Sequence, residues 1–219
     1  MKRLTPRTSN DDCPFGPALQ KYWERRYDLF SRFDDGIQVD ETALFSTKPE
    51  IHAADIAARL PGCEVIDAFC GVGGVAIALA RLGKKVIAVD IDAERLRMAM
   101  ENAKIYRCEH NITFVEANFL EYARHHGRVT SIYIDPPWGG PEYFRKDVFR
   151  LGDFVPDGAS ILQASLPIAD LVAMTVPTNF GLDEMKAYGS DFAVRMSHAW
   201  GRELFMTLYI DAARYRVSD

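Results

Sequence analysis

The sequence has few cysteines and no long apolar run, and each absence excludes a class of protein. Its 219 residues include four cysteines, with no Cys-x-x-Cys pair and no histidine at zinc spacing, so neither a disulfide framework nor a metal site is expected. No segment approaches the about 20 consecutive apolar residues of a membrane span, and no basic and apolar leader pattern opens the sequence. We therefore expect a protein that is not secreted and contacts no membrane, cytoplasmic or, in a eukaryote, nuclear.

An excess of positive charge is also missing, which limits how the protein can bind nucleic acid. The net charge is −5, which argues against coating a long nucleic acid by charge alone. The first 33 residues hold seven Lys or Arg against four Asp or Glu, and we expect this segment to be the RNA-facing patch. A solvated helix face with internal ion pairs explains Arg25 and Arg26 equally well.

The order of apolar segments predicts the fold. From residue 60 onward, strand and helix patterns alternate as in a doubly wound, Rossmann-like α/β domain with a mostly parallel sheet and helices on both faces. We expect seven strands, at 64–69, 84–90, 111–116, 129–134, 170–176, 192–199 and 203–210, the last two as an antiparallel pair. Helices are expected at 49–60, 75–82, 93–107, 119–126, 158–166 and 181–189.

The residues before this domain have a different pattern. We expect residues 1–48 to form a helical N-terminal extension, or lid, and residues 49–219 to form the catalytic domain. Residues 1–16 are polar and predict a mobile lead-in. Apolar and aromatic residues from 17 to 33 recur at helical spacing and predict one amphipathic helix, with Trp23 in the core.

The Asp-Pro-Pro-Trp sequence at residues 135–138 can hold a base amine. Such an amine is a poor nucleophile because its lone pair is delocalised into the ring. The Asp135 carboxylate and the Pro136 carbonyl can accept its two hydrogens and aim the lone pair at a methyl donor. Trp138 offers an apolar face on which a base can stack. A Pro-Pro turn that only ends a strand explains the sequence equally well, so the upstream context decides.

That context is a glycine turn between an expected strand and an expected helix. Residues 70–74 read Cys-Gly-Val-Gly-Gly, a turn that lets a ligand approach the backbone beside a helix N-terminus. The next strand ends in Asp90, about 20 residues later, where a carboxylate can accept ribose hydroxyls. The turn alone fits a dinucleotide or a phosphate, but an amine-holding Asp135 fits S-adenosylmethionine (SAM) best. We therefore expect SAM as the cofactor.

Short segments along most of the chain carry a family resemblance. They are residues 21–23, 29–37, 45–46, 49–50, 67–74, 90–92 and 136–141. With these segments the chain resembles trimethylguanosine synthases, which methylate N2 of the 7-methylguanosine cap on small RNAs. The resemblance implies a seven-stranded class I SAM-dependent methyltransferase whose N-terminal extension closes over substrate and cofactor. Its partner would be an RNA cap or a 7-methylguanosine nucleotide, and we expect the protein to act as a monomer.

The resemblance also implies roles for particular residues. The catalytic residues would be Asp135, Pro136 and Trp138. Those binding the cofactor would be Phe30, Asp67, Phe69, Gly71, Gly73, Asp90 and Asn118. In the substrate site, Trp138 would stack on the guanine, and Asn102 and Pro136 would contact its polar edge. Lys21 and Tyr143 would lie near the cap phosphates. The other substrate-binding residues would be Ser46 and Asn179.

Four positions depart from the family pattern. Asp135 stands where members commonly have Ser, and Asn118 where they place an Asp near the adenine. Thr178 stands where cap enzymes carry an Arg for the triphosphate, which indicates a missing phosphate clamp. Lys48 replaces a Thr, and it either restores part of that charge or is simply solvated.

The expected function is methyl transfer from SAM to N2 of a 7-methylguanosine cap. Because of Asp135 and Thr178, an alternative function is N-methylation of another base amine, either guanine N2 in ribosomal RNA or adenine N6. An alternative of another class is a non-catalytic cap-binding module that retains Trp138. Such a module has no use for the glycine turn and Asp90.

Overall fold

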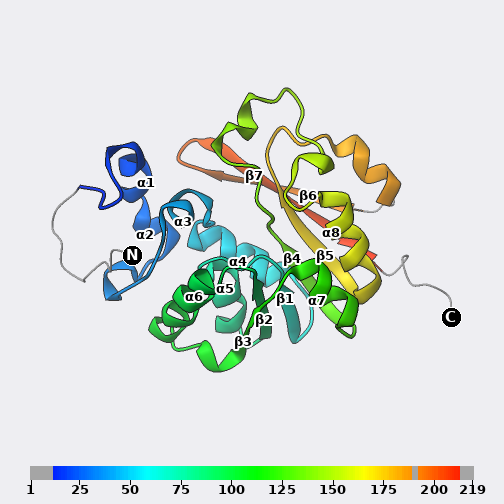
Figure 1. The fold of residues 1–219 in the computed structure, drawn as a ribbon, viewed down its shortest axis with the longest axis horizontal. Coiled ribbons are helices and arrows are strands. Elements are labelled where there is room, and N and C mark those ends of the chain that lie inside the picture. The colour runs from blue at the N-terminus through cyan, green and yellow to red at the C-terminus, as the bar shows by residue number, and fades with distance from the viewer. Residues whose placement is uncertain (1–11, 189–191, 213–219) are drawn as a thin grey trace. The chain divides into compact units, whose positions relative to one another are not determined.

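The strands form a seven-stranded sheet, shown in Figure 1. The computed structural model describes residues 12–188 and 192–212. Its strands are β1 (Glu64–Asp67), β2 (Lys85–Asp90), β3 (Ile112–Glu116), β4 (Val129–Ile134), β5 (Ala169–Val176), β6 (Phe192–Ala199) and β7 (Arg202–Asp211). Their order is β3-β2-β1-β4-β5-β7-β6. The pairs β2–β3, β1–β4 and β4–β5 are parallel, whereas β7 is antiparallel to β5 and β6. The expected Rossmann-like α/β fold and its antiparallel final pair are confirmed.

The helices are short, and most agree with the sequence pattern. They are α1 (Gln20–Trp23), α2 (Arg26–Leu29), α3 (Glu41–Ser46), α4 (Glu50–Arg59), α5 (Gly74–Arg81), α6 (Ala93–Ile105), α7 (Phe119–His125) and α8 (Gly158–Ser165). The expected helix at 181–189 is instead a 3₁₀ segment, η7 (Leu182–Tyr188). Helix α6 begins after Asp92, whose side chain accepts hydrogen bonds from the backbone N–H groups of Glu94 and Arg95.

The chain divides into two units, each built from two stretches of sequence. Unit 1 contains Met1–Arg59 and Cys70–Asn118, and unit 2 contains Leu60–Phe69 and Phe119–Asp219. Unit 1 therefore includes α1 to α6 with β2 and β3. Unit 2 includes the other five strands with α7 and α8.

The core of unit 1 surrounds helix α5. All its residues from Val75 to Ala80 are buried, because α5 packs against α4 on one side and β2 on another. A helix that is apolar all round is stable only in such a position. Helix α6 packs on β2 and β3 with its buried face.

The core of unit 2 lies along its central strands. Ile132 and Ile134 of β4 and Leu208 of β7 are completely buried, as is Ile161 of α8. Helices α7 and α8 lie side by side (Figure 1). Strand β6 is the edge of the sheet and is largely exposed.

The single helix expected from 17 to 33 is wrong. The segment breaks into a 3₁₀ turn (Pro17–Leu19), α1, α2 and a second 3₁₀ turn (Phe33–Asp35). The physical reason is aromatic packing. The ring centroids of Trp23 and Phe33 lie 5.5 Å apart in an edge-to-face pair, whereas ten residues of continuous helix would span about 15 Å. Trp23 is nevertheless in the core, as expected, with 3% of its surface exposed.

The lead-in expected at residues 1–16 falls mostly outside the described residues, which begin at 12. Where it is described, it is tied to the extension. Cys13 is buried, and its backbone N–H donates a 2.8 Å hydrogen bond to the Gln20 side chain.

Candidate functional site

The glycine turn in unit 1 has a backbone that only glycine adopts readily. Gly71 has φ +53° and Gly73 has φ +92°, both in the left-handed region. A Cβ on Gly73 would lie 3.1 Å from the Cβ of Ala99 in α6, so helix and turn are in close contact. A Cβ on Gly71 would meet nothing within 4 Å. The turn is therefore closed toward α6 and open beside Gly71.

Asp90, at the end of β2, holds this turn in place. Its Oδ2 accepts a 2.8 Å hydrogen bond from the Gly71 N–H, and its Oδ1 accepts one of 3.0 Å from the Asp92 N–H. The carboxylate is half-buried. Each carboxylate oxygen has a second lone pair, which leaves capacity for two further donors. An open turn beside a fixed acceptor for hydroxyl groups fits the ribose of SAM.

Asn118 lies at the same edge of unit 1. It follows β3, which pairs with β2 so that Glu116 is opposite Asp90. The backbone N–H of Ala117 donates a 3.0 Å hydrogen bond to the Asp90 carbonyl, and Asn118 itself is exposed. Unit 1 thus brings together four of the expected cofactor residues, namely Gly71, Gly73, Asp90 and Asn118.

Asn102 does not have the environment expected of a substrate contact. Its side chain is completely buried in α6. Its Oδ1 accepts a 2.7 Å hydrogen bond from the Gln38 N–H, and its Nδ2 donates to the carbonyls of Gln38 at 2.9 Å and Val72 at 3.0 Å. Both amide hydrogens are used, and no surface remains for a guanine. A contact of Asn102 with the guanine edge stays a prediction, and in this structure the amide is used by the backbone of Gln38 and Val72.

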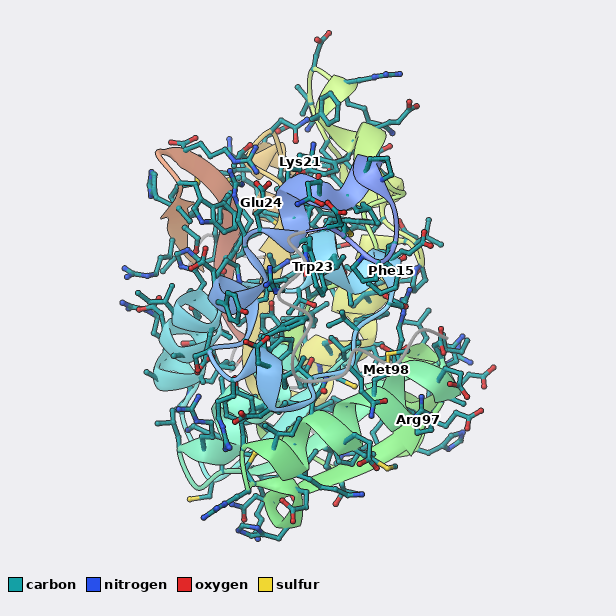
Figure 2. The ribbon with its side chains drawn as sticks, turned by 90° about the vertical axis from the view of Figure 1, so that its left-hand side faces the viewer. Phe15, Lys21, Trp23, Glu24, Arg97 and Met98 are labelled. Atoms are coloured by element: carbon teal, nitrogen blue, oxygen red, sulfur yellow. The ribbon has the colours of Figure 1, made fainter. Side chains whose placement is uncertain are left out.

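The other expected site residues of the extension vary in exposure. Phe30 is buried, with its ring centroid 6.4 Å from that of Tyr106 at the end of α6. Lys21 is exposed, and its Nζ lies 4.8 Å from the centre of the Tyr22 ring. Ser46 is exposed at the end of α3. Figure 2 shows Lys21 on the extension and Arg97 on α6, both labelled. The roles of Phe30, Lys21 and Ser46 remain predictions.

Within unit 1, the extension is anchored to the other helices by a cluster around Glu50, which the sequence analysis missed. The Glu50 carboxylate accepts hydrogen bonds from the Ser31 N–H at 2.6 Å, from Arg81 at 2.6 Å and from the Tyr106 hydroxyl at 3.0 Å. Burial alone would raise the pKa of Glu50, but these donors outweigh it and lower the pKa. No local pattern marks such a cluster, because its members lie up to 75 residues apart in the chain (Ser31 to Tyr106).

Lys48, which could have been solvated, is buried in the structure with 8% of its surface exposed. It follows Thr47, whose side chain would lie 3.1 Å from a Cβ on Gly74, at the end of the glycine turn. The interpretation of Lys48 as a solvated surface charge is therefore wrong.

In unit 2 the Asp-Pro-Pro-Trp sequence follows β4, as expected. Asp135 is half-buried and Pro136 is buried. Trp138 is half-buried, and Tyr143 meets it in an edge-to-face pair with ring centroids 4.8 Å apart and an interplanar angle of 84°. Such a pair fixes the orientation of the indole ring while occupying only part of its surface. The tetrapeptide thus presents a carboxylate, a fixed carbonyl and an oriented aromatic ring.

Buried polar side chains lie beneath Asp135, and the sequence analysis missed them. The Tyr133 hydroxyl is 2.8 Å from the Thr175 hydroxyl, and both side chains are buried. Burial, then the charge of Asp135, and also that of Asp67, raise the pKa of Tyr133 well above its usual value. Asp67 lies opposite Tyr133 in the sheet register and is 1% exposed. The alternation of Ser131, Tyr133 and Asp135 along β4 is the signal that could have identified this polar row.

Asp67 and Phe69, the remaining expected cofactor residues, lie at the end of β1 in unit 2. Phe69 forms a tilted ring pair with Phe119, with centroids 5.7 Å apart. Their roles toward a cofactor remain predictions.

Asn179 joins two loops of unit 2. Its Nδ2 donates to the carbonyls of Lys146 at 2.8 Å and Tyr143 at 3.3 Å, and its backbone carbonyl accepts from the Phe149 N–H at 2.9 Å. It therefore positions the loop that carries Tyr143. A direct contact of Asn179 with substrate stays a prediction. Thr178, the preceding residue, is exposed.

Residues 12–188 and 192–212 contain neither a membrane-spanning helix nor a metal site. No helix in these ranges is long and apolar enough to cross a membrane. Nor do the same residues contain a group of three or more His, Cys, Asp or Glu that could hold a metal ion.

Comparisons with known proteins show the family of this chain. A family model described as RNA cap guanine-N2 methyltransferase matches residues 63–203. The trimethylguanosine synthase of Schizosaccharomyces pombe is 37% identical over 191 residues, which are 81% of this chain and 79% of that protein. The trimethylguanosine synthase of Saccharomyces cerevisiae is 31% identical over 179 residues, which are 76% of this chain and 57% of that protein.

Solved structures confirm the fold. A putative methyltransferase from Porphyromonas gingivalis superposes with a TM-score of 0.66 at 19% identity, over 95% of this chain and 54% of that one. The magnesium protoporphyrin IX methyltransferase of Synechocystis, solved with bound SAM, gives a TM-score of 0.56 at 18% identity, over 86% of this chain and 95% of that one.

Proposed function

Because this chain belongs to the RNA cap guanine-N2 methyltransferase family, we propose that it transfers a methyl group from SAM to N2 of a 7-methylguanosine cap. The observation that best supports this proposal is the Asp135 to Trp138 sequence after β4, where Tyr143 orients the indole ring of Trp138. We further propose that residues 1–48 act as a lid on a catalytic domain formed by residues 49–219.

The cofactor would be held mainly by the glycine turn and the acids near it. Bound SAM supplies an electrophilic methyl group on a sulfonium. Gly71 and Gly73 would admit its methionine end together with Asp67, and Asp90 would accept the ribose hydroxyls with lone pairs that its backbone donors leave available. Asn118 would contact the adenine, and Phe69 is a further residue proposed to bind the cofactor.

Asp135 and Pro136 would prepare the amine. Their oxygens would accept the two amine hydrogens and direct the nitrogen lone pair outward. The product ammonium is acidic, and its proton would pass to Asp135 or to water. Pro136 keeps its carbonyl in place because the ring of the next proline restricts the backbone before it.

Trp138 would select the base by its charge. A 7-methylguanine ring is cationic, so it gains cation–π attraction on an indole face worth about 0.5–2 kcal/mol beyond neutral stacking. The edge-on contact with Tyr143 leaves Trp138 half-buried and so partly accessible to a ring. This preference would be sufficient to favour a cap over GTP.

A substrate competition tests the proposal. Radiolabelled SAM is offered with 7-methylguanosine triphosphate, with GTP and with an adenine-containing oligonucleotide. We expect label on the 7-methylated nucleotide far above GTP, with most of that preference lost in Trp138→Ala and retained in Trp200→Ala, a matched change at the exposed β6–β7 turn. Equal labelling of GTP and 7-methylguanosine triphosphate would refute the cap as substrate.

One observation supports a second candidate. The Thr178 side chain is exposed and uncharged at the position expected to carry a phosphate clamp, and Asp135 suits the amines of several bases. In the same assay an adenine-N6 methyltransferase would label only the adenine-containing oligonucleotide, whereas a methyltransferase of ribosomal guanine N2 would transfer label only when ribosomal RNA is added as a fourth substrate.

A further inference from the structure

Asn102 connects three parts of unit 1 through one buried amide. It projects from α6, the Gln38 backbone belongs to the N-terminal extension, and Val72 belongs to the glycine turn. Only one orientation of the amide satisfies all three backbone groups, because Gln38 N–H needs the oxygen and the two carbonyls need the nitrogen. The side chain is 0% exposed, so water does not compete for these bonds.

The extension meets Asn102 in a fixed register. Ile37 and Val39 are buried on either side of the half-buried Gln38. The Gln38 side chain also accepts a 3.1 Å hydrogen bond from Arg97, and Asp40 accepts one of 2.9 Å from Arg95. These two contacts join the extension to α6 alone. The Asn102 amide joins the extension and α6 to the turn that would hold the cofactor.

We propose that Asn102 is a positioning residue that couples occupation of the glycine turn to the placement of extension residues 37–40. The Val72 carbonyl lies between Gly71 and Gly73, so any adjustment of the turn to a ligand changes its hydrogen bond with Asn102. The same amide then restrains Gln38. This inference rests on SAM binding at the turn, which is part of the proposed function, and does not depend on the cap as substrate.

Hydrogen exchange of the whole chain with and without S-adenosylhomocysteine tests the coupling. In the wild type we expect the ligand to increase protection of amides in residues 29–40. Asn102→Ala should lose this ligand-induced increase and bind S-adenosylhomocysteine about tenfold more weakly by calorimetry. Arg97→Ala is the matched control on the same helix, since it removes the contact with the Gln38 side chain and the ion pair with Glu94 but leaves the Asn102 amide in place, and it should keep both properties.

A second pair of variants covers the case in which Asn102→Ala fails to fold. Gln38→Pro removes the backbone N–H that donates a hydrogen bond to Asn102, whereas Gln38→Ala keeps this N–H and removes only the side chain. We expect the ligand-induced increase to be lost in Gln38→Pro and kept in Gln38→Ala.

A purely structural role for Asn102 would lower protection equally with and without ligand. A folded Asn102→Ala, or Gln38→Pro, that retains the full ligand-induced increase overturns the coupling and leaves the proposed function intact. A wild type that does not bind S-adenosylhomocysteine overturns both.

Discussion

The hydroxyl of Tyr133 in β4 lies 2.8 Å from that of Thr175 in β5, and both side chains are buried beside the strand end that carries Asp135. Replacing Tyr133 with Phe leaves the Thr175 hydroxyl buried without this partner. Such a loss costs about 1–3 kcal/mol of the free energy of unfolding. Urea denaturation of Tyr133→Phe at neutral pH should show a decrease in that range.

The same residue should make stability fall at high pH. Burial, with the charges of Asp135 and Asp67, raises the pKa of Tyr133 well above its usual value. Above about pH 10 the unfolded chain releases this proton and the folded chain keeps it, so the free energy of unfolding falls as pH rises. The difference between wild type and Tyr133→Phe should therefore shrink from pH 8 to pH 10.5. An unchanged difference would contradict the burial of Tyr133.

Glu50 should give the opposite pH dependence. Its donors lower its pKa, so its contribution is present above the ordinary pKa of a glutamate and is lost as pH falls below about 4. Because the cluster is partly open to solvent, we expect Glu50→Gln to lower the free energy of unfolding by about 1 kcal/mol at pH 7. Denaturation from pH 7 to pH 3.5 should show the two proteins converging. A constant difference would show that charge at Glu50 has no part in anchoring the extension.

The sequence predicted the sheet better than the extension, for a physical reason. Buried strands such as 129–134 show their apolar character locally, so alternation of strand and helix was sufficient to predict all seven. In the extension, helical spacing from 17 to 33 was overruled by packing between Trp23 and Phe33. Local pattern contains no information about that contact.

In the candidate site, too, some features were predictable from the local sequence and others were not. The glycine turn and Asp90 follow strand ends, so their proximity was predictable from the topology of parallel strands. Asn102 was expected at the substrate because a motif specifies the residue type and not what it touches. Its partners Gln38 and Val72 lie 64 and 30 residues away in the chain, and only the folded structure brings them to it.

Asp90 should determine cofactor affinity. Asp90→Ala removes the acceptors proposed for the ribose and also releases the Gly71 N–H, so we expect SAM binding to weaken by about 1.5–3 kcal/mol. Asp90→Asn retains one oxygen acceptor and should lie between alanine and wild type. Calorimetry with SAM measures both variants. Unchanged affinity in Asp90→Ala would remove Asp90 from the cofactor site.

Asp135 should act on turnover and not on cofactor binding. If its carboxylate accepts an amine hydrogen mainly in the transition state, Asp135→Ala should reduce turnover about a hundredfold or more at unchanged SAM affinity. Asp135→Ser restores an oxygen acceptor and should recover part of the loss. Single-turnover rates with saturating SAM separate the two effects. Near-normal turnover in Asp135→Ala would leave the Pro136 carbonyl as the proposed acceptor.

Thr178 should limit the contribution of the cap phosphates to binding. It is exposed, and it precedes Asn179, whose side chain is anchored to the carbonyls of Lys146 and Tyr143, so a longer side chain at 178 could extend without disturbing the loop. The wild type should gain little affinity from 7-methylguanosine monophosphate to the triphosphate. Thr178→Arg should enlarge that gain by roughly 1–2 kcal/mol at low salt, and less at high salt because ions screen the contact. Thr178→Gln, of similar length without charge, is the control. Equal gains in the two variants would show that no phosphate approaches position 178.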